Sequence, residues 1–510
     1  MYKKSKDRLL LTTAVTITFA LAAPAANAAD LTLPNNQVFA GNGNADSTSP
    51  LNAAAGDNVN LNGFTLDVSI VATTDDGTDN GTLDVGIVSG AGDLQVTTGG
   101  LGGATTDTAT IIQGVSNVTG VLITNLDGDN AAIDATIIEG VSTTADFEVT
   151  NAETDSAEAI QVTVNGDMAI GGATNINGGA GGAATGLILL GNNDFGNNVV
   201  VTGGNGASDE AVLVLSGATT SFNTGLTLNN GAGGLALLEV AGAVEQTITG
   251  DIAGTGDISV SNTAEEGAFF SGNVNLGAIT VDSDGNDQLV VLGGNVTTTG
   301  AIDLGNGSGT DTIILALGNT GTTTIAATGG ITDGGSETTV LVAQGGGTIT
   351  MNSDVNVDDV RVQGNTTFDV NQVLATSAGV TIEDGSTFDV GNGAITSDFT
   401  NAGDLNISGS GNITGNVANN GFLLFDGGST GGIFGNVTGL GTLTVDGNAA
   451  SISGNVTQGA GEISGNLTVH GNYTVGNTQF DSNSASLTIA ANGDMTGNLT
   501  AVSPGNGRLI

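Results

Sequence analysis

Few residues of this 510-residue chain have the chemistry that an active site needs. Histidine occurs once, as His470, and cysteine is absent. Catalytic triads and zinc sites need a second histidine or a cysteine, so we interpret His470 as a structural or surface residue. Asp358 and Asp359, close to Arg361, are the nearest match to the paired carboxylates of a glycoside hydrolase, but no aromatic sugar platform accompanies them. We therefore predict no catalytic residue and no enzymatic activity, and a polysaccharide-active enzyme is the least favoured alternative.

Calcium is the more credible chemistry, because oxygen-rich turns could supply hard ligands. Acidic clusters with this composition occur at residues 75–79, 127–129 and 282–287. The last resembles the start of an EF-hand loop, but Asp287 stands where that loop requires glycine and Gly293 where it requires glutamate. Residues 306–314 resemble one calcium-binding nonapeptide, and such a site needs tandem copies. Since Asp and Asn favour turns without any metal, we predict no cofactor and no metal ligands, and calcium stays open as an alternative.

The distribution of charge indicates export. Four of the six basic residues lie within the first eight positions, before an apolar run at residues 9–23 and small residues at 26–28. This three-part pattern is typical of a cleavable secretory signal, which we assign to residues 1–28. Beyond it, the only basic residues are Arg361 and Arg508.

The acidic balance excludes several classes of partner. With 51 acidic against 6 basic residues, the formal net charge is −45. Nucleic acids and anionic lipids bind to clustered Lys and Arg, so neither is an expected partner. No later apolar stretch is long enough for a membrane-spanning helix, so we expect no direct insertion of the mature body into a membrane.

The body of the chain has the pattern of a repetitive β protein. Short runs of Val, Ile and Leu alternate with Gly, Asn and Asp turns, which favours strands, and almost no helix is expected after residue 28. Residues 110–116 return at 136–142, an offset of 26, and residues 364–370 are echoed at 384–390, an offset of 20. A Gly-Asn-x-Thr motif also recurs, with drifting spacing.

These repeats predict an all-β fold, a long parallel β-helix of degenerate 20–26 residue coils. Because like residues stack on like, Phe368 and Phe388 should lie in adjacent coils, and the Asn of the Gly-Asn turns should form amide ladders. An antiparallel sandwich array is the alternative fold. We assign residues 29–50 to an N-terminal cap segment, 51–503 to the repeat region with a sub-boundary near 350, and 504–510 to a truncated or disordered C-terminus. Residues 51–503 contain no proline, as a continuous ladder requires.

A family resemblance lies in the signal that ends Ala26-Asn27-Ala28, the Gly/Asn/Thr/Val-rich body, the lack of cysteine and the Gly-Asn-Val-Thr turns. These features resemble the passenger domains of autotransporter-type surface proteins, particularly the rickettsial outer membrane protein B kind. The resemblance implies a β-helical region exposed at the cell surface or outer membrane, or outside the cell, of a Gram-negative bacterium. The family ends in a C-terminal translocating barrel that this sequence does not reach by Ile510, so we expect a fragment or another route of release.

The sequence therefore predicts an exported, non-catalytic surface protein that acts in adhesion or cell-surface coating. Its expected partners are a host or neighbouring-cell surface, or further copies of itself. The main alternative is an acidic S-layer-type structural protein assembled with calcium.

Overall fold

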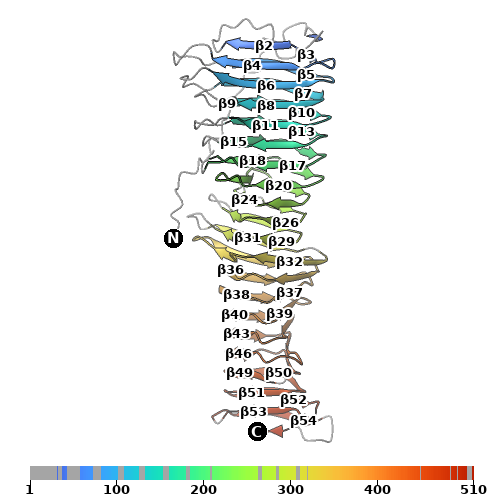
Figure 1. The fold of residues 1–510 in the computed structure, drawn as a ribbon. Helices are drawn as coiled ribbons and strands as arrows, with labels where there is room; N and C mark the ends of the chain where they lie inside the picture. Colours follow the sequence, from blue (N-terminus) through green and yellow to red (C-terminus); the bar gives the residue numbers. More distant parts are fainter. Residues whose placement is uncertain are drawn as a thin grey trace.

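The computed structural model is an elongated stack of short β-strands (Figure 1). It describes residues 31–32, 37–42, 58–72, 82–100, 108–125, 133–152, 160–179, 184–206, 209–261, 267–282, 287–305, 311–318, 320–447, 449–482, 484–490, 492–501 and 508–510. Strand pairing in these residues is parallel from the first coil to the last, and they contain no helix, hence none that could cross a membrane. The predicted parallel β-helix is confirmed, and the antiparallel sandwich array is wrong. The predicted signal peptide and Pro34, Pro50 and Pro504 lie outside the described residues.

The strands form three parallel ladders, each built from one short segment of every coil. The first ladder contains β1 (Leu31–Thr32), β3 (Asn58–Asn60), β10 (Gly140–Thr143), β13 (Asp167–Ile170), β16 (Asn193–Phe195), β19 (Thr219–Phe222), β22 (Gln246–Thr249), β25 (Ala268–Phe270), β28 (Gln288–Leu292), β31 (Thr312–Leu317), β34 (Thr338–Ala343), β41 (Phe399–Asn401), β44 (Val417–Asn419) and β47 (Val437–Thr438).

The second ladder contains β2 (Gln37–Asn42), β4 (Leu66–Ala72), β6 (Asp93–Gly100), β8 (Gly120–Asn125), β11 (Phe147–Asn151), β14 (Thr174–Asn177), β17 (Val199–Thr202), β20 (Leu226–Asn229), β23 (Ile252–Gly254), β26 (Val274–Leu276), β29 (Val296–Thr298), β32 (Thr322–Ala327), β35 (Thr348–Met351), β37 (Thr367–Val370), β39 (Thr387–Val390), β42 (Asp404–Ile407), β45 (Phe422–Phe425) and β48 (Thr442–Val445).

The third ladder contains β9 (Ile133–Ile137), β12 (Ile160–Val164), β15 (Thr185–Leu189), β18 (Ala211–Leu215), β21 (Ala236–Val240), β24 (Asp257–Val260), β27 (Ile279–Val281), β30 (Ile302–Leu304), β33 (Ile331–Asp333), β40 (Ala394–Thr396), β43 (Asn412–Thr414), β46 (Gly432–Phe434), β49 (Ala450–Ile452), β51 (Asn466–Val469), β53 (Ser486–Ile489) and β55 (Arg508–Leu509). The longer strands that turn a corner and pair in two ladders are β5 (Thr82–Ser89), β7 (Thr108–Val118), β36 (Val355–Val362), β38 (Leu374–Ile382), β50 (Val456–Ile463), β52 (Tyr473–Phe480) and β54 (Met495–Ala501).

The coils become shorter along the chain, as the register partners of successive layers show. Leu315 pairs with Leu341, and Leu341 then pairs with Val360, so the second of these coils is clearly the shorter. This shortening occurs near residue 350, where the Gly-Asn and Phe-Asp motifs become dense, and the stack is narrower beyond β36 (Figure 1). The ladders run through this position without a break.

A continuous apolar core fills the stack, because alternate residues of the strands point inward. A small second cluster of buried residues contains Ala316, Val340 and Val342. In β37 and β39 the pattern places Phe368 and Phe388 inside, both fully buried, while the Asp beside each lies on the outer face. The two phenylalanines are register partners in adjacent coils, as predicted, with ring centroids 5.6 Å apart in an edge-to-face arrangement. Phe388 makes a second edge-to-face contact with Phe399, at 5.3 Å.

The repeat that links residues 110–116 with 136–142 is in register over only part of its length. Val115 pairs with Val141, and in the next ladder Thr124 pairs with Thr150, as the repeat predicts. Ile112, however, pairs with Ile137 and not with Ile138. The offset of 26 is therefore not the register here, because both Ile112 and Ile137 face the core, where they are fully buried.

An outer row of asparagine and aspartate side chains links the coils at one corner. This outer corner row contains Asp398, Asn416, Asn436, Asn455, Asn472 and Asp494. The backbone N–H of each member after the first donates to the side-chain Oδ1 of the member before it, at 2.6 to 3.0 Å. Asn436 and Asn455 belong to Gly-Asn-Val-Thr motifs, so the predicted amide ladder is confirmed.

A second amide row lies inside the core. Asn419 Oδ1 accepts a hydrogen bond from Asn401 Nδ2 at 2.8 Å, and Asn419 Nδ2 donates to Gln458 Oε1 at 2.7 Å. This inner amide row skips one coil, because Gly439, which follows Thr438 in register between Asn419 and Gln458, has no side chain. A Cβ at Gly439 would overlap the Asn419 carbonyl oxygen, and its φ of +132° favours glycine.

Asp389→Asn is expected to stabilise the protein at neutral pH. Burial raises the pKa of the Asp389 carboxyl above its ordinary value of 3.8, the hydrogen bond from Ser408 opposes this, and the charges of Asp369 and Asp426 add to it. Ionised Asp389 therefore costs stability above its folded pKa, and the cost vanishes below 3.8. Its register partner in the next coil is already an asparagine, Asn406. We expect a gain of roughly 0.2–1 kcal/mol at pH 7, the range of cross-strand pairs. Denaturant unfolding at pH 7 and pH 3 checks this, and an equal gain at both would contradict it.

Candidate functional site

The outline of the solenoid steps inward at one corner just after β38. Ala375 pairs with Thr396, and Val380 pairs with Phe399. Between these partners β38 has residues 376–379, whereas the next coil has only Ser397 and Asp398. The extra residues must bulge outward, which makes an overhang above the shorter corner.

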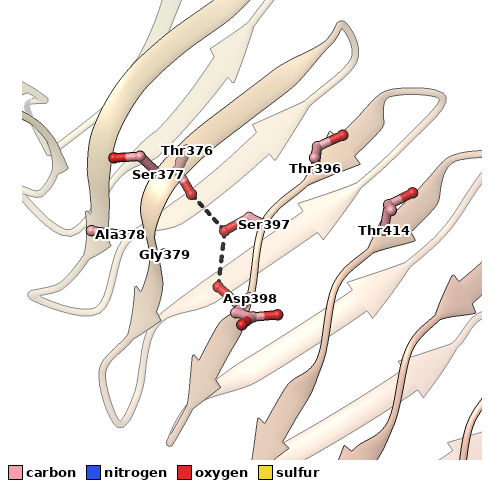
Figure 2. A pocket seen from close by; sticks show the side chains of 8 residues that line it. All are labelled: Thr376, Ser377, Ala378, Gly379, Thr396, Ser397, Asp398 and Thr414. Carbon is pink, nitrogen blue, oxygen red and sulfur yellow. Dashed lines mark hydrogen bonds between the residues drawn. The ribbon is translucent and has the colours of Figure 1, made fainter.

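A depression of about 240 Å³ lies at this step, and we call it the β38 depression. Its lining is small and polar: Thr376, Ser377, Ala378, Gly379, Thr396, Ser397, Asp398 and Thr414. Figure 2 shows these residues on three successive coils, with the side chains of Thr396 and Thr414 pointing the same way from neighbouring strands.

Hydrogen bonds fix the base of the β38 depression. Ser397 Oγ donates to the Asp398 carbonyl oxygen at 2.9 Å, so the 2.7 Å contact between Thr376 and Ser397 has the Thr376 hydroxyl as donor (Figure 2). Asp398 Oδ1 accepts the backbone N–H of Asn416 at 2.6 Å. Within the described residues Asp398 Oδ2 and the exposed hydroxyls of Thr396 and Thr414 make no hydrogen bond, so they are available to a ligand.

The carboxylates that most resemble a hydrolase pair are both engaged in the fold. Asp358 Oδ2 accepts the backbone N–H of Thr339 at 3.1 Å, and its Oδ1 accepts the hydroxyl of Ser377. Asp359 Oδ2 pairs with Arg361 Nε at 2.8 Å. Of the three residues, only Asp359 and Arg361 are in contact, and each of the two carboxylates has a structural partner.

His470 lies at an exposed corner directly after β51, where its backbone N–H donates to the Ile452 carbonyl oxygen at 3.0 Å. It lies several coils away from the β38 depression and from Asp358 and Asp359, so the single histidine is not brought to these acids. The predicted surface position is confirmed.

Most of the candidate calcium turns fall outside the described residues, namely 75–79, 127–129, 283–286 and 306–310. Of the third cluster, Asp287 Oδ1 accepts the backbone N–H of Thr312 at 2.7 Å. Burial raises the pKa of the Asp333 carboxyl above 3.8, and nearby acids, Asp358 first among them, add to this. Within the described part of the chain, no group of three or more acids or histidines is arranged to hold a metal ion. Calcium binding stays an alternative prediction.

Sequence reasoning missed the β38 depression and the inner amide row. The depression depends on a difference of two residues between neighbouring corners, and no motif marks that difference. The inner row could have been suspected from Asn401 and Asn419, which end similar short apolar segments in consecutive coils. Searches for a matching family, a similar curated protein and a similar solved structure found none.

Proposed function

We propose that this chain is an exported, non-catalytic surface protein whose β-helical rod acts in adhesion or cell-surface coating. The observation that carries the proposal is that acidic side chains at the corners hold neighbouring coils together by hydrogen bonds. At the corners they accept hydrogen bonds from the backbone of the next coil, as Asp251 does from Asn273, Asp354 from Val373 and Asp398 from Asn416. Carboxylates that bond to the backbone support a structural role for the protein, and their negative charge favours its solubility.

The N-terminal pattern and the autotransporter resemblance support location at the cell surface. A long rod with a continuous ladder projects whatever surface it carries away from the cell, which suits adhesion and coating equally. Acidic repeat proteins of the S-layer type are the second candidate, and they differ in needing calcium for assembly.

The test is to treat intact producing cells with an external protease and to sequence the N-terminus of the chain. We expect digestion from outside while a periplasmic marker stays intact, and a chain that begins at Ala29. A matched variant with Val15→Arg and Ile17→Arg in the apolar run should keep Met1 and stay protected. A wild-type chain that keeps residues 1–28 and resists protease until lysis would refute the proposal.

A further inference from the structure

An exposed aromatic ring lies on the same outer column as the β38 depression. Thr396 pairs with Thr414, and Thr414 pairs with Phe434 in the next coil. The Phe434 side chain is 55% exposed, and it is the only aromatic residue among the strongly exposed large hydrophobic residues of the described chain. Neighbouring strands are about 4.8 Å apart, so Phe434 projects from the strand next to Thr414, the last residue that lines the depression.

Phe434 and the β38 depression together present a flat apolar surface next to polar groups. Phe434 offers a ring face, while the hydroxyls of Thr396 and Thr414 and the Oδ2 of Asp398 offer donors and acceptors within two coils. A pyranose has the matching arrangement, because its C–H face is apolar and its rim carries hydroxyls. An aromatic ring left in water is unfavourable, and covering it with the C–H face of a sugar recovers that cost.

We propose that the β38 depression and Phe434 form a binding site for a neutral saccharide. One sugar unit of a chain stacks on Phe434 and bonds to the Thr414 hydroxyl, and the next unit bonds to the Thr396 hydroxyl and to Asp398 Oδ2. The saccharide would be the ligand in the adhesion role proposed above, and this inference rests on that role.

The charges around the site decide the class of saccharide. Asp398 lines the depression, and Asp358 lies one coil away, bonded to Ser377. The nearest basic group along these coils, Arg361, is paired with Asp359. With a net charge of −45, the protein repels uronates and sulfated glycans. A carboxylate such as Asp398 is instead a strong acceptor for sugar hydroxyls.

The experiment is native affinity electrophoresis of the full chain in gels that contain mannan, dextran, laminarin or galactomannan, with heparin as the anionic control. We expect at least one neutral polysaccharide to retard the protein and heparin not to do so. Phe434→Ala should weaken that binding by roughly tenfold, the effect of losing about 1.4 kcal/mol. Thr414→Val should weaken it as well, because the methyl group cannot bond to a sugar hydroxyl.

The matched control is Leu440→Ala, which removes another exposed hydrophobic side chain, 87% exposed, at a different corner. It should leave the retardation unchanged, and circular dichroism should be the same for all variants. No retardation by any of the four neutral polysaccharides, or equal retardation of wild type and Phe434→Ala, would overturn the saccharide site. Surface exposure in the protease test would still uphold the proposed function in that case, so the two failures are distinguishable.

Discussion

Asn419→Asp is expected to lower the free energy of unfolding by about 3–5 kcal/mol at pH 7, the cost of an uncompensated buried charge. The two side chains have nearly the same shape, so packing is preserved. Aspartate, however, loses the Nδ2 donor that bonds to Gln458 Oε1 and to the Thr442 carbonyl oxygen. It also places a carboxylate in the core, where Asn419 is fully buried. Denaturant unfolding followed by circular dichroism measures the loss.

The pH dependence of the loss and a matched variant show whether the buried charge or the altered side-chain shape destabilises Asn419→Asp. Burial raises the folded-state pKa of the introduced carboxyl, so the penalty should shrink below about pH 4, where the group is neutral in both states. Asn436→Asp makes the same change in the outer corner row, where Asp398 and Asp494 already occupy equivalent positions. We expect it to cost less than about 1 kcal/mol, as exposed hydrogen bonds do. Equal losses for both variants would contradict the distinction between the inner and outer rows.

Phe388→Ala is expected to lower the free energy of unfolding by about 3–5 kcal/mol, the usual cost of a phenylalanine truncated inside a core. The ring is fully buried and contacts both Phe368 and Phe399, so its removal leaves a cavity that links neighbouring coils. Because a stacked repeat protein can open locally, amide hydrogen exchange should show the largest increase in β37, β39 and β41. The same denaturant titration provides the global value.

Phe434→Ala is the matched control for this change. It removes the same atoms from a side chain that is 55% exposed, so we expect a change within about 0.5 kcal/mol. If the two phenylalanine variants had similar stability, Phe388 would not lie in the core and the inward register of β39 would be wrong.

The core was predictable from sequence where a repeat contains a large side chain. Phe368 and Phe388 occupy the same place in nearly identical segments, and both must face inward, so their pairing follows from the spacing alone. The amides of the outer corner row were predictable for the same reason, because Asn416, Asn436, Asn455 and Asn472 each follow a glycine in the repeated Gly-Asn pattern. Repeats of small and β-branched residues fix the pairing between coils less well than repeats that contain a large side chain. At residues 110–112 the offset of the repeat differs from the register by one position, since Ile112 pairs with Ile137.

The candidate site could not be predicted in the same way. The β38 depression arises where residues 376–379 of one coil face only Ser397 and Asp398 of the next. Threonine and serine at these positions look like any other strand and turn residues of the sequence. Phe434 is equally ambiguous, because its neighbour Ile433 takes the inward position and only the register shows that the ring faces solvent.

The acidic corners are hydrogen-bond acceptors between coils, and we therefore expect the rod to fold completely without metal. Thermal unfolding of the purified full chain in excess EDTA and in millimolar calcium, followed by far-ultraviolet circular dichroism, tests this most directly. We predict a full β-sheet signal and the same melting midpoint in both solutions, because a ligand raises the midpoint only if it binds the folded state. A signal or midpoint that falls in EDTA and returns with calcium would show that the fold depends on the metal, and it would favour the calcium-assembled S-layer alternative.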